Sequence, residues 1–229
     1  MYQQEALLDG LVLPPYDPCI AGIDEVGRGA LAGPVVAAAV ILPQDYDLPG
    51  LADSKTLDFT TREKLAYAIR RYSLAWSLGV VGQRTIDRIN ILEATFMAMA
   101  MAVSRLSIKP DLLYIDGNKR IPSPVLIRFW SNYRTDTLPG QKTIVHGDAL
   151  EDVISAASIV AKSYRDALMR RMSIRYPKYG FDEHVGYGTA RHMKAIALYG
   201  PCPLHRKTFR GVRKDTKEET LAREGSLFD

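Results

Sequence analysis

Two apolar segments separated by a glycine-rich turn constrain the fold of this chain more than any other feature. Residues 19–25 are apolar up to the acidic pair Asp24-Glu25, residues 34–42 are apolar throughout, and glycine and proline residues bound both segments. Both are too short to cross a membrane, and short apolar runs between turn residues are typical of buried strands. We therefore expect two buried strands early in the chain, joined by a tight glycine-rich turn.

The rest of the chain alternates strand and helix patterns. Further strands are expected over residues 73–81, 111–116 and 142–146. Helices are expected over residues 60–71, with Thr60 or Thr61 as the N-cap, over 90–106, and over 149–172 as one long helix. This order predicts an α/β fold, a mixed β-sheet flanked by helices, with a small helical region at the C-terminal end.

Composition divides the chain into four parts. Residues 1–18 contain Pro14, Pro15 and Pro18 and are expected to form an irregular lead. Residues 19–175 would form the α/β domain, residues 176–214 a basic helical region, and residues 215–229 a loose tail.

The two cysteines, Cys19 and Cys202, cannot build a disulfide framework, which favours a reducing compartment. The first ten residues lack the basic start and apolar core of a signal peptide, and no apolar run reaches the length of a membrane span. We therefore expect a cytoplasmic protein with no membrane partner, and we expect it to be a monomer.

Positive charge is concentrated in the second half of the chain. Residues 1–115 hold 10 basic and 13 acidic side chains, whereas residues 116–229 hold 20 basic and 13 acidic. Residues 191–214 contain seven lysines and arginines and no acidic residue. This block indicates a polyanionic partner, nucleic acid first, although a basic face that contacts only solvent has the same composition.

Acidic residues follow three of the expected strands. Asp24 and Glu25 come after CIAGI, Asp116 after LLYI, and Asp148 after the strand TIVH. In α/β sheets, functional sites form at such strand ends. Structural alternatives exist for each: Asp148 with Glu151 resembles a capping box, Asp116 precedes a glycine in a possible turn, and Asp24 and Glu25 face opposite sides of a regular strand unless it ends or bulges there.

Four carboxylates without matching histidines favour Mg²⁺ or Mn²⁺ over zinc. The fragment Cys202-x-x-His205 lacks a second ligand pair, and the chain has no P-loop and no serine-nucleophile motif. Carboxylates that hold divalent cations, together with a basic region, are the apparatus of phosphodiester hydrolysis.

Several segments, in this order, resemble the motifs of the ribonuclease HII family, the bacterial type 2 ribonucleases H. They are AGIDEVGRGALAGPVVAAAVIL from residue 21, LADSKTL from 51, LLYIDGN from 112, GDALEDVISAASIVAKSYRD from 147, YPKYGFDEHVGYGTARHMKAI from 176 and GPCPLHRKTF from 200. The resemblance spans about residues 19–213. The resemblance implies a ribonuclease H-like mixed sheet with a small C-terminal helical part.

The resemblance also implies the activity and the site. The expected enzyme is a divalent-metal endoribonuclease that cleaves the RNA strand of RNA/DNA hybrids and cuts on the 5′ side of single ribonucleotides in duplex DNA. Asp24, Glu25, Asp116 and Asp148 match the catalytic metal-binding positions. Gly27, Arg28 and Gly29 match the loop that reads the ribose 2′-hydroxyl, and Tyr187 matches the tyrosine that packs on the following sugar. Lys55 and Lys162 are candidate phosphate contacts.

Two rival hypotheses and one further partner remain open at the level of sequence. The rivals are another ribonuclease H-like nuclease, such as a junction resolvase or a proofreading exonuclease, and a hybrid-binding protein without catalysis. The adjacent pair Asp24-Glu25 argues against the D-x-E pattern of the exonucleases, and the presence of all four carboxylates argues against a non-catalytic protein. Ser226-Leu227-Phe228 loosely resembles a sliding-clamp-binding peptide.

Overall fold

A five-stranded mixed sheet forms the centre of the computed structural model, which describes residues 7–8, 11–12, 17–51, 58–130 and 137–212. Its strands, in spatial order, are β5 (Ala75–Val81), β4 (Val35–Ile41), β3 (Ile20–Val26), β6 (Leu112–Asp116) and β7 (Gly140–Ile144). The first three pair antiparallel, and β3, β6 and β7 pair parallel. The mixed sheet confirms the predicted α/β class, and all five predicted strands are present to within a few residues.

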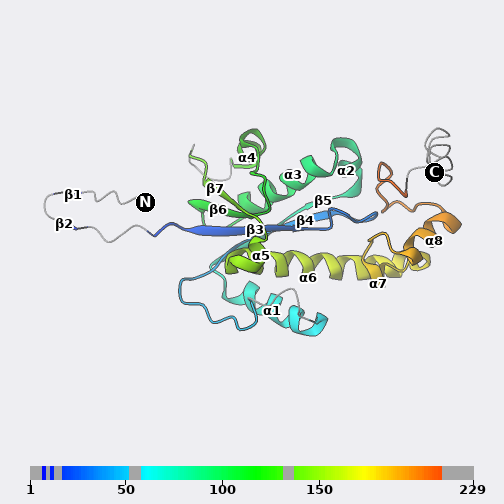
Figure 1. Ribbon diagram of the computed structural model, residues 1–229, viewed down its shortest axis with the longest axis horizontal. Coiled ribbons are helices and arrows are strands. Elements are labelled where there is room, and N and C mark those ends of the chain that lie inside the picture. The colour runs from blue at the N-terminus through cyan, green and yellow to red at the C-terminus, as the bar shows by residue number, and fades with distance from the viewer. Residues whose placement is uncertain (1–6, 9–10, 13–16, 52–57, 131–136, 213–229) are drawn as a thin grey trace, which may run out of the picture.

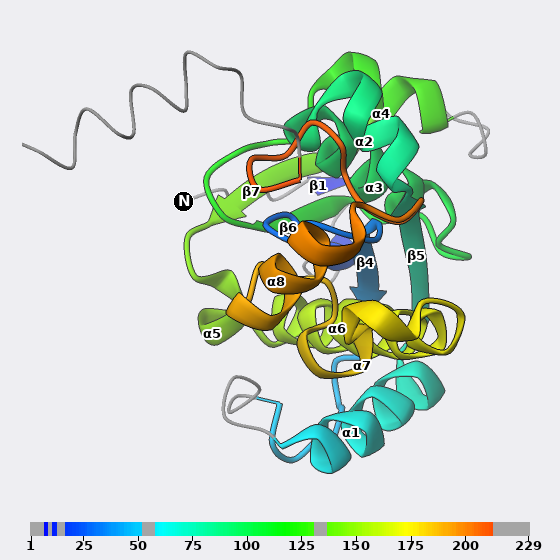
Figure 2. The same cartoon turned by 90° about the vertical axis from the view of Figure 1, so that its right-hand side faces the viewer.

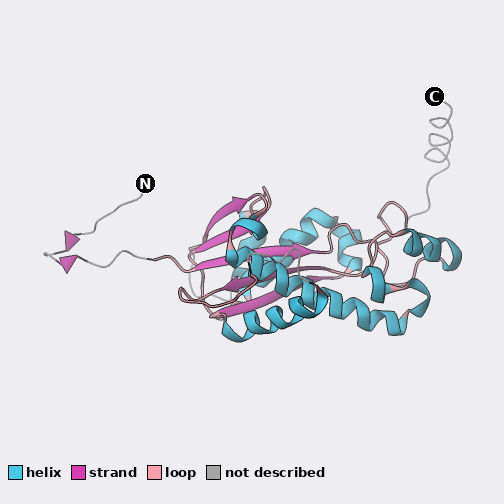
Figure 3. Cartoon of the chain, turned by 60° about the horizontal axis from the view of Figure 1, so that its bottom comes forward, coloured by secondary structure: helices cyan, strands magenta, loops and turns pink. Residues whose placement is uncertain are grey.

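Helices cover both faces of this sheet, as Figures 1 and 3 show. One face carries α2 (Gln83–Ile89), α3 (Ile91–Ser104) and α4 (Ser123–Trp130). The other carries α1 (Phe59–Tyr72), α5 (Gly147–Leu150) and α6 (Asp152–Arg175). None of the helices in the described ranges combines the length and apolar character that a membrane crossing requires.

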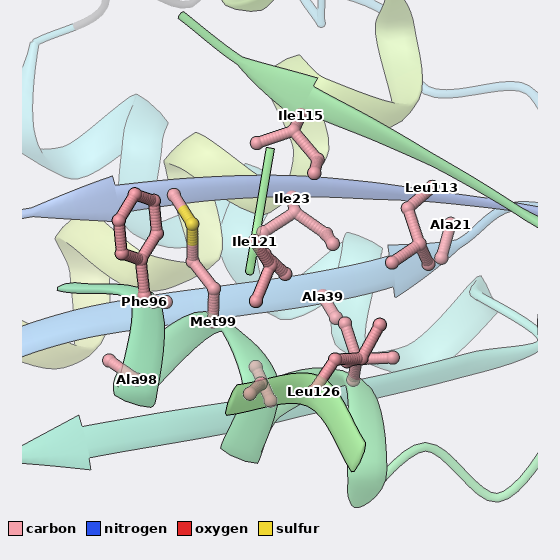
Figure 4. Packing of buried hydrophobic residues seen from close by; sticks show 14 of the residues in the cluster. Ala21, Ile23, Ala39, Phe96, Ala98, Met99, Leu113, Ile115, Ile121 and Leu126 are labelled. Atoms are coloured by element: carbon pink, nitrogen blue, oxygen red, sulfur yellow. The ribbon is translucent and has the colours of Figure 1, made fainter. Parts of the chain in front are cut away.

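Alternate residues of the central strands fill two separate cores. Ala21 and Ile23 of β3 pack with Leu113 and Ile115 of β6 against α3 and α4 (Figure 4). On the opposite face, Val36, Ala38 and Val40 of β4 pack against α1 and α6. Small side chains on β4 let the helices approach the sheet closely, which explains why the alanine-rich segment is a central strand.

A C-terminal region closes one end of the sheet. It contains the short 3₁₀ helix η1 (Pro177–Tyr179), α7 (Phe181–His184) and α8 (Ala190–Tyr199), which lie beyond the tip of β3 in Figure 1 and face the viewer in Figure 2. Tyr179, Phe181 and Cys202 form a third apolar cluster with Ala32 and with Met169 of α6. The predicted boundary at residues 175/176 stays a prediction, and it divides residues that share this cluster.

The sequence predictions of helix ends and of the lead need correction. Asp58 is the N-cap of α1, because its carboxylate accepts from the backbone N–H of Thr61 at 2.9 Å, so the predicted caps Thr60 and Thr61 are wrong. The predicted helix over 149–172 is two helices that break at the extended residue Glu151. Helices α2 and α4 were not predicted. Within the lead, β1 (Leu7–Leu8) and β2 (Leu11–Val12) pair antiparallel, and the tail lies outside the described residues.

Candidate active site

Asp24 and Asp116 lie side by side at the carboxyl ends of two parallel strands. Ile23 of β3 is paired in register with Ile115 of β6, so the next residue of each strand is an aspartate on the α6 face. The backbone N–H of Glu25 donates to Oδ1 of Asp24 at 2.7 Å. Parallel pairing thus brings together two carboxylates that are far apart in sequence, as predicted from their positions after apolar strands.

Glu25 lies on the other face of β3. Strand β3 pairs regularly with β4 through Val26, so it neither ends nor bulges between Asp24 and Glu25. The Glu25 carboxylate accepts instead from Nη1 of Arg28 at 3.1 Å. The condition under which both side chains would reach one face of the strand is therefore not met.

Asp148 lies in the first turn of α5, directly after a residue that contacts Asp116. The backbone N–H of Gly147 donates to Oδ1 of Asp116 at 2.8 Å, which fixes the start of α5 against the end of β6. The N-cap residue of α5 is His146, and α6 has Glu151 in that position, so the interpretation of Asp148 as a helix cap is wrong. The site predicted from four carboxylates thus draws on β3, β6 and α5.

Burial controls the electrostatics of these carboxylates. Desolvation raises the pKa of Asp24 to about 8, a hydrogen bond from Ser158 opposes this, and the negative charges of Glu25 and Asp116 add to it. Desolvation also raises the pKa of Glu25, while Arg28 lowers it. Asp24 is only 7% exposed, so its negative charge is costly unless a cation offsets it.

The donor set fits a hard divalent cation. Every candidate ligand is a carboxylate oxygen, which is the ligand that Mg²⁺ and Mn²⁺ prefer, and a cation would offset the charge that burial disfavours on Asp24. Among the described residues, however, no three His, Cys, Asp or Glu side chains already stand close enough to hold a metal together.

The predicted ribose-reading loop forms the turn between β3 and β4. Gly27 has φ +87°, and a Cβ there would lie 2.2 Å from Nε of Arg165, so both conformation and packing require glycine. A Cβ on Gly29 would meet no atom of the described chain within 4 Å. Packing among the described residues therefore does not explain Gly29.

Tyr187 lies next to this turn. Gly186 accepts from the backbone N–H of Leu31 at 2.8 Å, so the loop between α7 and α8 is bonded to the β3–β4 turn. Tyr187 is 37% exposed, and its ring centroid lies 5.4 Å from the guanidinium carbon of Arg165. The structure thus places one predicted sugar contact, Tyr187, beside the predicted ribose-reading loop.

The two candidate phosphate contacts have different outcomes. Lys162 lies half-buried on α6, and Lys55 lies outside the described residues. The sequence predictions did not include Arg165 and Arg206, which are both fully buried beneath the β3–β4 turn. Only the basic character of residues 191–214 pointed toward Arg206, and nothing in the local sequence distinguished it from a surface arginine.

Known proteins similar to this chain agree with the geometry. The family model for ribonuclease HII matches residues 21–212. The ribonuclease HII of Nitratidesulfovibrio vulgaris is 55% identical over 202 residues, which cover 88% of this chain and 90% of that protein. The chain belongs to the ribonuclease HII family. It is therefore a metal-dependent endoribonuclease, as the motifs implied, which removes the rival nuclease classes.

Other relatives extend this finding. The ribonuclease HII of Geobacter metallireducens is 53% identical, with 85% of each chain covered. The crystal structure of ribonuclease H2 from Pyrococcus horikoshii OT3 superposes with a TM-score of 0.68 at 27% identity, covering 90% of this chain and 99% of that one. The ribonuclease HII fold is thus confirmed. Ribonuclease HII from Archaeoglobus fulgidus, solved in a complex with PCNA, shares the fold at 24% identity and a TM-score of 0.65, covering 87% and 98%.

Proposed function

We propose that this enzyme hydrolyses the RNA strand of RNA/DNA hybrids and cuts on the 5′ side of single ribonucleotides in duplex DNA, leaving 3′-hydroxyl and 5′-phosphate ends. The observation that carries the proposal is the junction of the two sugar-reading loops: Gly186, next to Tyr187, accepts from Leu31 of the turn that holds Gly27 and Gly29. The turn begins at Gly27, two residues after Glu25, which supports a substrate path in which the sugar contacts and the carboxylates act on the same nucleotide.

Asp24 and Asp116 would hold Mg²⁺ or Mn²⁺ most directly, and Glu25 and Asp148 would complete the ligand set. The bound ions would supply activation of water and stabilisation of the leaving oxygen, the chemistry of two-metal phosphodiester hydrolysis. Burial raises the pKa of Asp24 to about 8, so binding of a cation near neutral pH would release a proton from this carboxyl group. The Glu25–Arg28 ion pair would restrain the turn that follows β3.

Recognition of ribose would come from backbone and aromatic groups. Arg28 and Gly29 are exposed residues, and their backbone N–H groups would bind the 2′-hydroxyl, the group that separates RNA from DNA at the cut. Tyr187 would pack on the following sugar. Lys162 and Lys55, with the basic residues of 191–214, would contact phosphates and weaken binding as salt rises.

The test is cleavage of an end-labelled DNA duplex that carries one ribonucleotide, with an all-DNA duplex as the control. Wild type and Asp24→Asn are compared with Mg²⁺, Mn²⁺ and chelator. We expect a metal-dependent cut immediately 5′ of the ribonucleotide in the wild type alone. Binding without any cut would favour the hybrid-binding rival, and cutting of the all-DNA duplex would exclude ribose reading.

The finer statements on partner and place are also proposals. Ser226-Leu227-Phe228, outside the described residues, would bind the sliding clamp, with support only from its loose sequence resemblance to a clamp-binding peptide. A pull-down with the clamp protein that compares the full chain with one ending at Glu224 tests this, and equal retention would end the idea. We propose further that the enzyme acts as a monomer in the cytoplasm, in keeping with the free thiols of Cys19 and Cys202.

A further inference from the structure

Two buried arginines hold the β3–β4 turn by its backbone carbonyls. Arg206 donates from Nη2 to Gly27 O at 2.6 Å, from Nη1 to Arg28 O at 2.7 Å and from Nε to Gly33 O at 3.0 Å. Arg165 donates to three other carbonyls, those of Ala32, Pro34 and Val185. Figure 2 shows the turn, in blue, beside the orange-red segment that follows α8 and carries Arg206.

This arrangement is electrostatically expensive. Both side chains have 0% exposure, and among the described residues no carboxylate lies within ion-pair distance of either guanidinium. Burial and the charge of Arg165 lower the pKa of Arg206 to about 9, so it is still charged at neutral pH. Apolar side chains would fill such a space at lower cost, because buried charges are rarely a net source of stability. The arginines are better explained by what they orient.

Peptide geometry defines what Arg206 orients. In a planar trans peptide the carbonyl and the N–H point in opposite directions. The carbonyls of Gly27 and Arg28 both point at Arg206, so the N–H groups of Arg28 and Gly29 point away from it. Both residues are exposed, and neither N–H donates to another group within the described residues. A carbonyl that accepts from a charged donor also polarises its peptide and strengthens the N–H as a donor.

We propose that Arg206 is a positioning residue for ribose selectivity: it locks the two peptides that follow Gly27 so that the N–H groups of Arg28 and Gly29 face the 2′-hydroxyl. The proposal rests on the proposed ribose-reading role of Gly27-Arg28-Gly29. Arg165 supports the same turn from below, packing against Gly27 and linking it to Val185 in the Tyr187 loop. Arg206 itself touches neither substrate nor metal.

The experiment measures selectivity separately from stability. Cleavage of a labelled one-ribonucleotide duplex gives kcat and KM, and inhibition by an unlabelled all-DNA duplex gives Ki. The ratio of Ki to KM reports preference for ribose and does not depend on the folded fraction. Arg206→Met removes the donors at similar volume, Arg206→Lys keeps one point charge in place of the fork, and Leu126→Ala creates a cavity in the remote core that α4 covers.

We expect Arg206→Met to lower kcat/KM by about 100-fold and to bring the selectivity ratio close to one, because misplacement of a contact by about 1 Å is enough for such a loss. Arg206→Lys should recover part of the ratio of Ki to KM. Leu126→Ala should lower the melting temperature and leave the ratio of Ki to KM unchanged. If Arg206→Met does not fold, the test rests on Arg206→Lys, for which we expect a ratio of Ki to KM below that of the wild type. A wild-type ratio in both Arg206 variants overturns the proposal, whereas a ratio near one in the wild type overturns the proposed ribose reading itself.

Discussion

Two regions of this enzyme bury polar side chains, and they differ in whether those side chains find partners within the protein. At the ends of β3 and β6, Asp24 and Asp116 lie together, and burial raises the pKa of Asp24. In the C-terminal region, His192 and His205 are also buried, but their ring nitrogens are hydrogen-bonded to each other at 3.0 Å and to backbone groups. Burial lowers the pKa of both histidines, so they are neutral.

The difference separates chemistry from architecture. The carboxylate region carries a charge that the described residues only partly offset, and such a site gains free energy when a cation arrives. The histidine chain, by which we mean the hydrogen-bonded pair His192 and His205, has partners within the protein for its ring nitrogens. Nδ1 of His192 donates to the Tyr187 carbonyl at 2.9 Å, and Nδ1 of His205 accepts from the Cys202 N–H at 2.9 Å. It needs no ligand, and it holds the loop that presents Tyr187.

The sharpest test of unsatisfied against satisfied burial neutralises one buried carboxylate that lacks an ion-pair partner and one that has such a partner. Asp24→Asn should lower kcat/KM by about 1,000-fold or more, because it removes a proposed metal ligand. It should nevertheless raise the melting temperature in chelator, because it removes a carboxyl group that folding forces to take up a proton at neutral pH. Asp166→Asn is the matched control: Asp166 is 5% exposed but paired with Arg62 at 3.0 Å. It should lower the melting temperature and keep activity. Equal stability changes in the two variants would remove the distinction.

The histidine chain should contribute to the stability of the fold. His192→Phe keeps the aromatic stack on His184 but leaves the Tyr187 carbonyl and Nε2 of His205 without their partner. We expect the free energy of unfolding to fall by about 2–3 kcal/mol, the cost of stranded buried polar groups. Urea unfolding followed by circular dichroism measures this. A fall of less than about 0.5 kcal/mol in the free energy of unfolding would mean that the histidine chain stabilises the fold no more than a typical surface residue does.

The two glycines that flank Arg28 in the β3–β4 turn should separate folding from function within one loop. Gly27→Ala forces a side chain into positive φ and into Arg165, so we expect a loss of about 1–3 kcal/mol of unfolding free energy. Gly29→Ala meets no neighbour, so its stability should stay within about 0.5 kcal/mol of wild type while kcat/KM falls about tenfold. Thermal melts and single-ribonucleotide cleavage measure both. A fully active Gly29→Ala would show that substrate does not approach there.

The pH dependence of stability should have opposite signs for the two regions. The pKa of Asp24 is raised to about 8, so the folded state binds the extra proton and stability in chelator falls as pH rises toward 8. The pKa of His205 is lowered to about 4, so its contribution is present above pH 6.5 and is lost as pH falls. Between pH 6.5 and 8 the slope should reach at most about 1.4 kcal/mol per pH unit, and Asp24→Asn should flatten it. Denaturant unfolding at a series of pH values checks this, and an unchanged slope in the variant would assign it to another group.

The amino-acid sequence by itself determined the five strands, the acidic residues at their ends and the family. Apolar runs between turn residues locate strands because a buried strand needs apolar residues that are consecutive in the sequence. The family motifs contain the candidate site residues. Parallel pairing then made the meeting of Asp24 and Asp116 predictable, since carboxyl ends of parallel strands share one edge.

Only the tertiary structure decided which groups support the site. The regular β3–β4 register puts Glu25 on the opposite face of the strand from Asp24. The fold also interrupts the long predicted helix at Glu151 and docks the first residue of α5, Gly147, on Asp116. Arg165 and Arg206 look like surface arginines in sequence because their partners are backbone carbonyls that are distant in the chain. Periodicity records that a residue is buried, but the long-range partner that makes a buried charge acceptable exists only once the chain has folded.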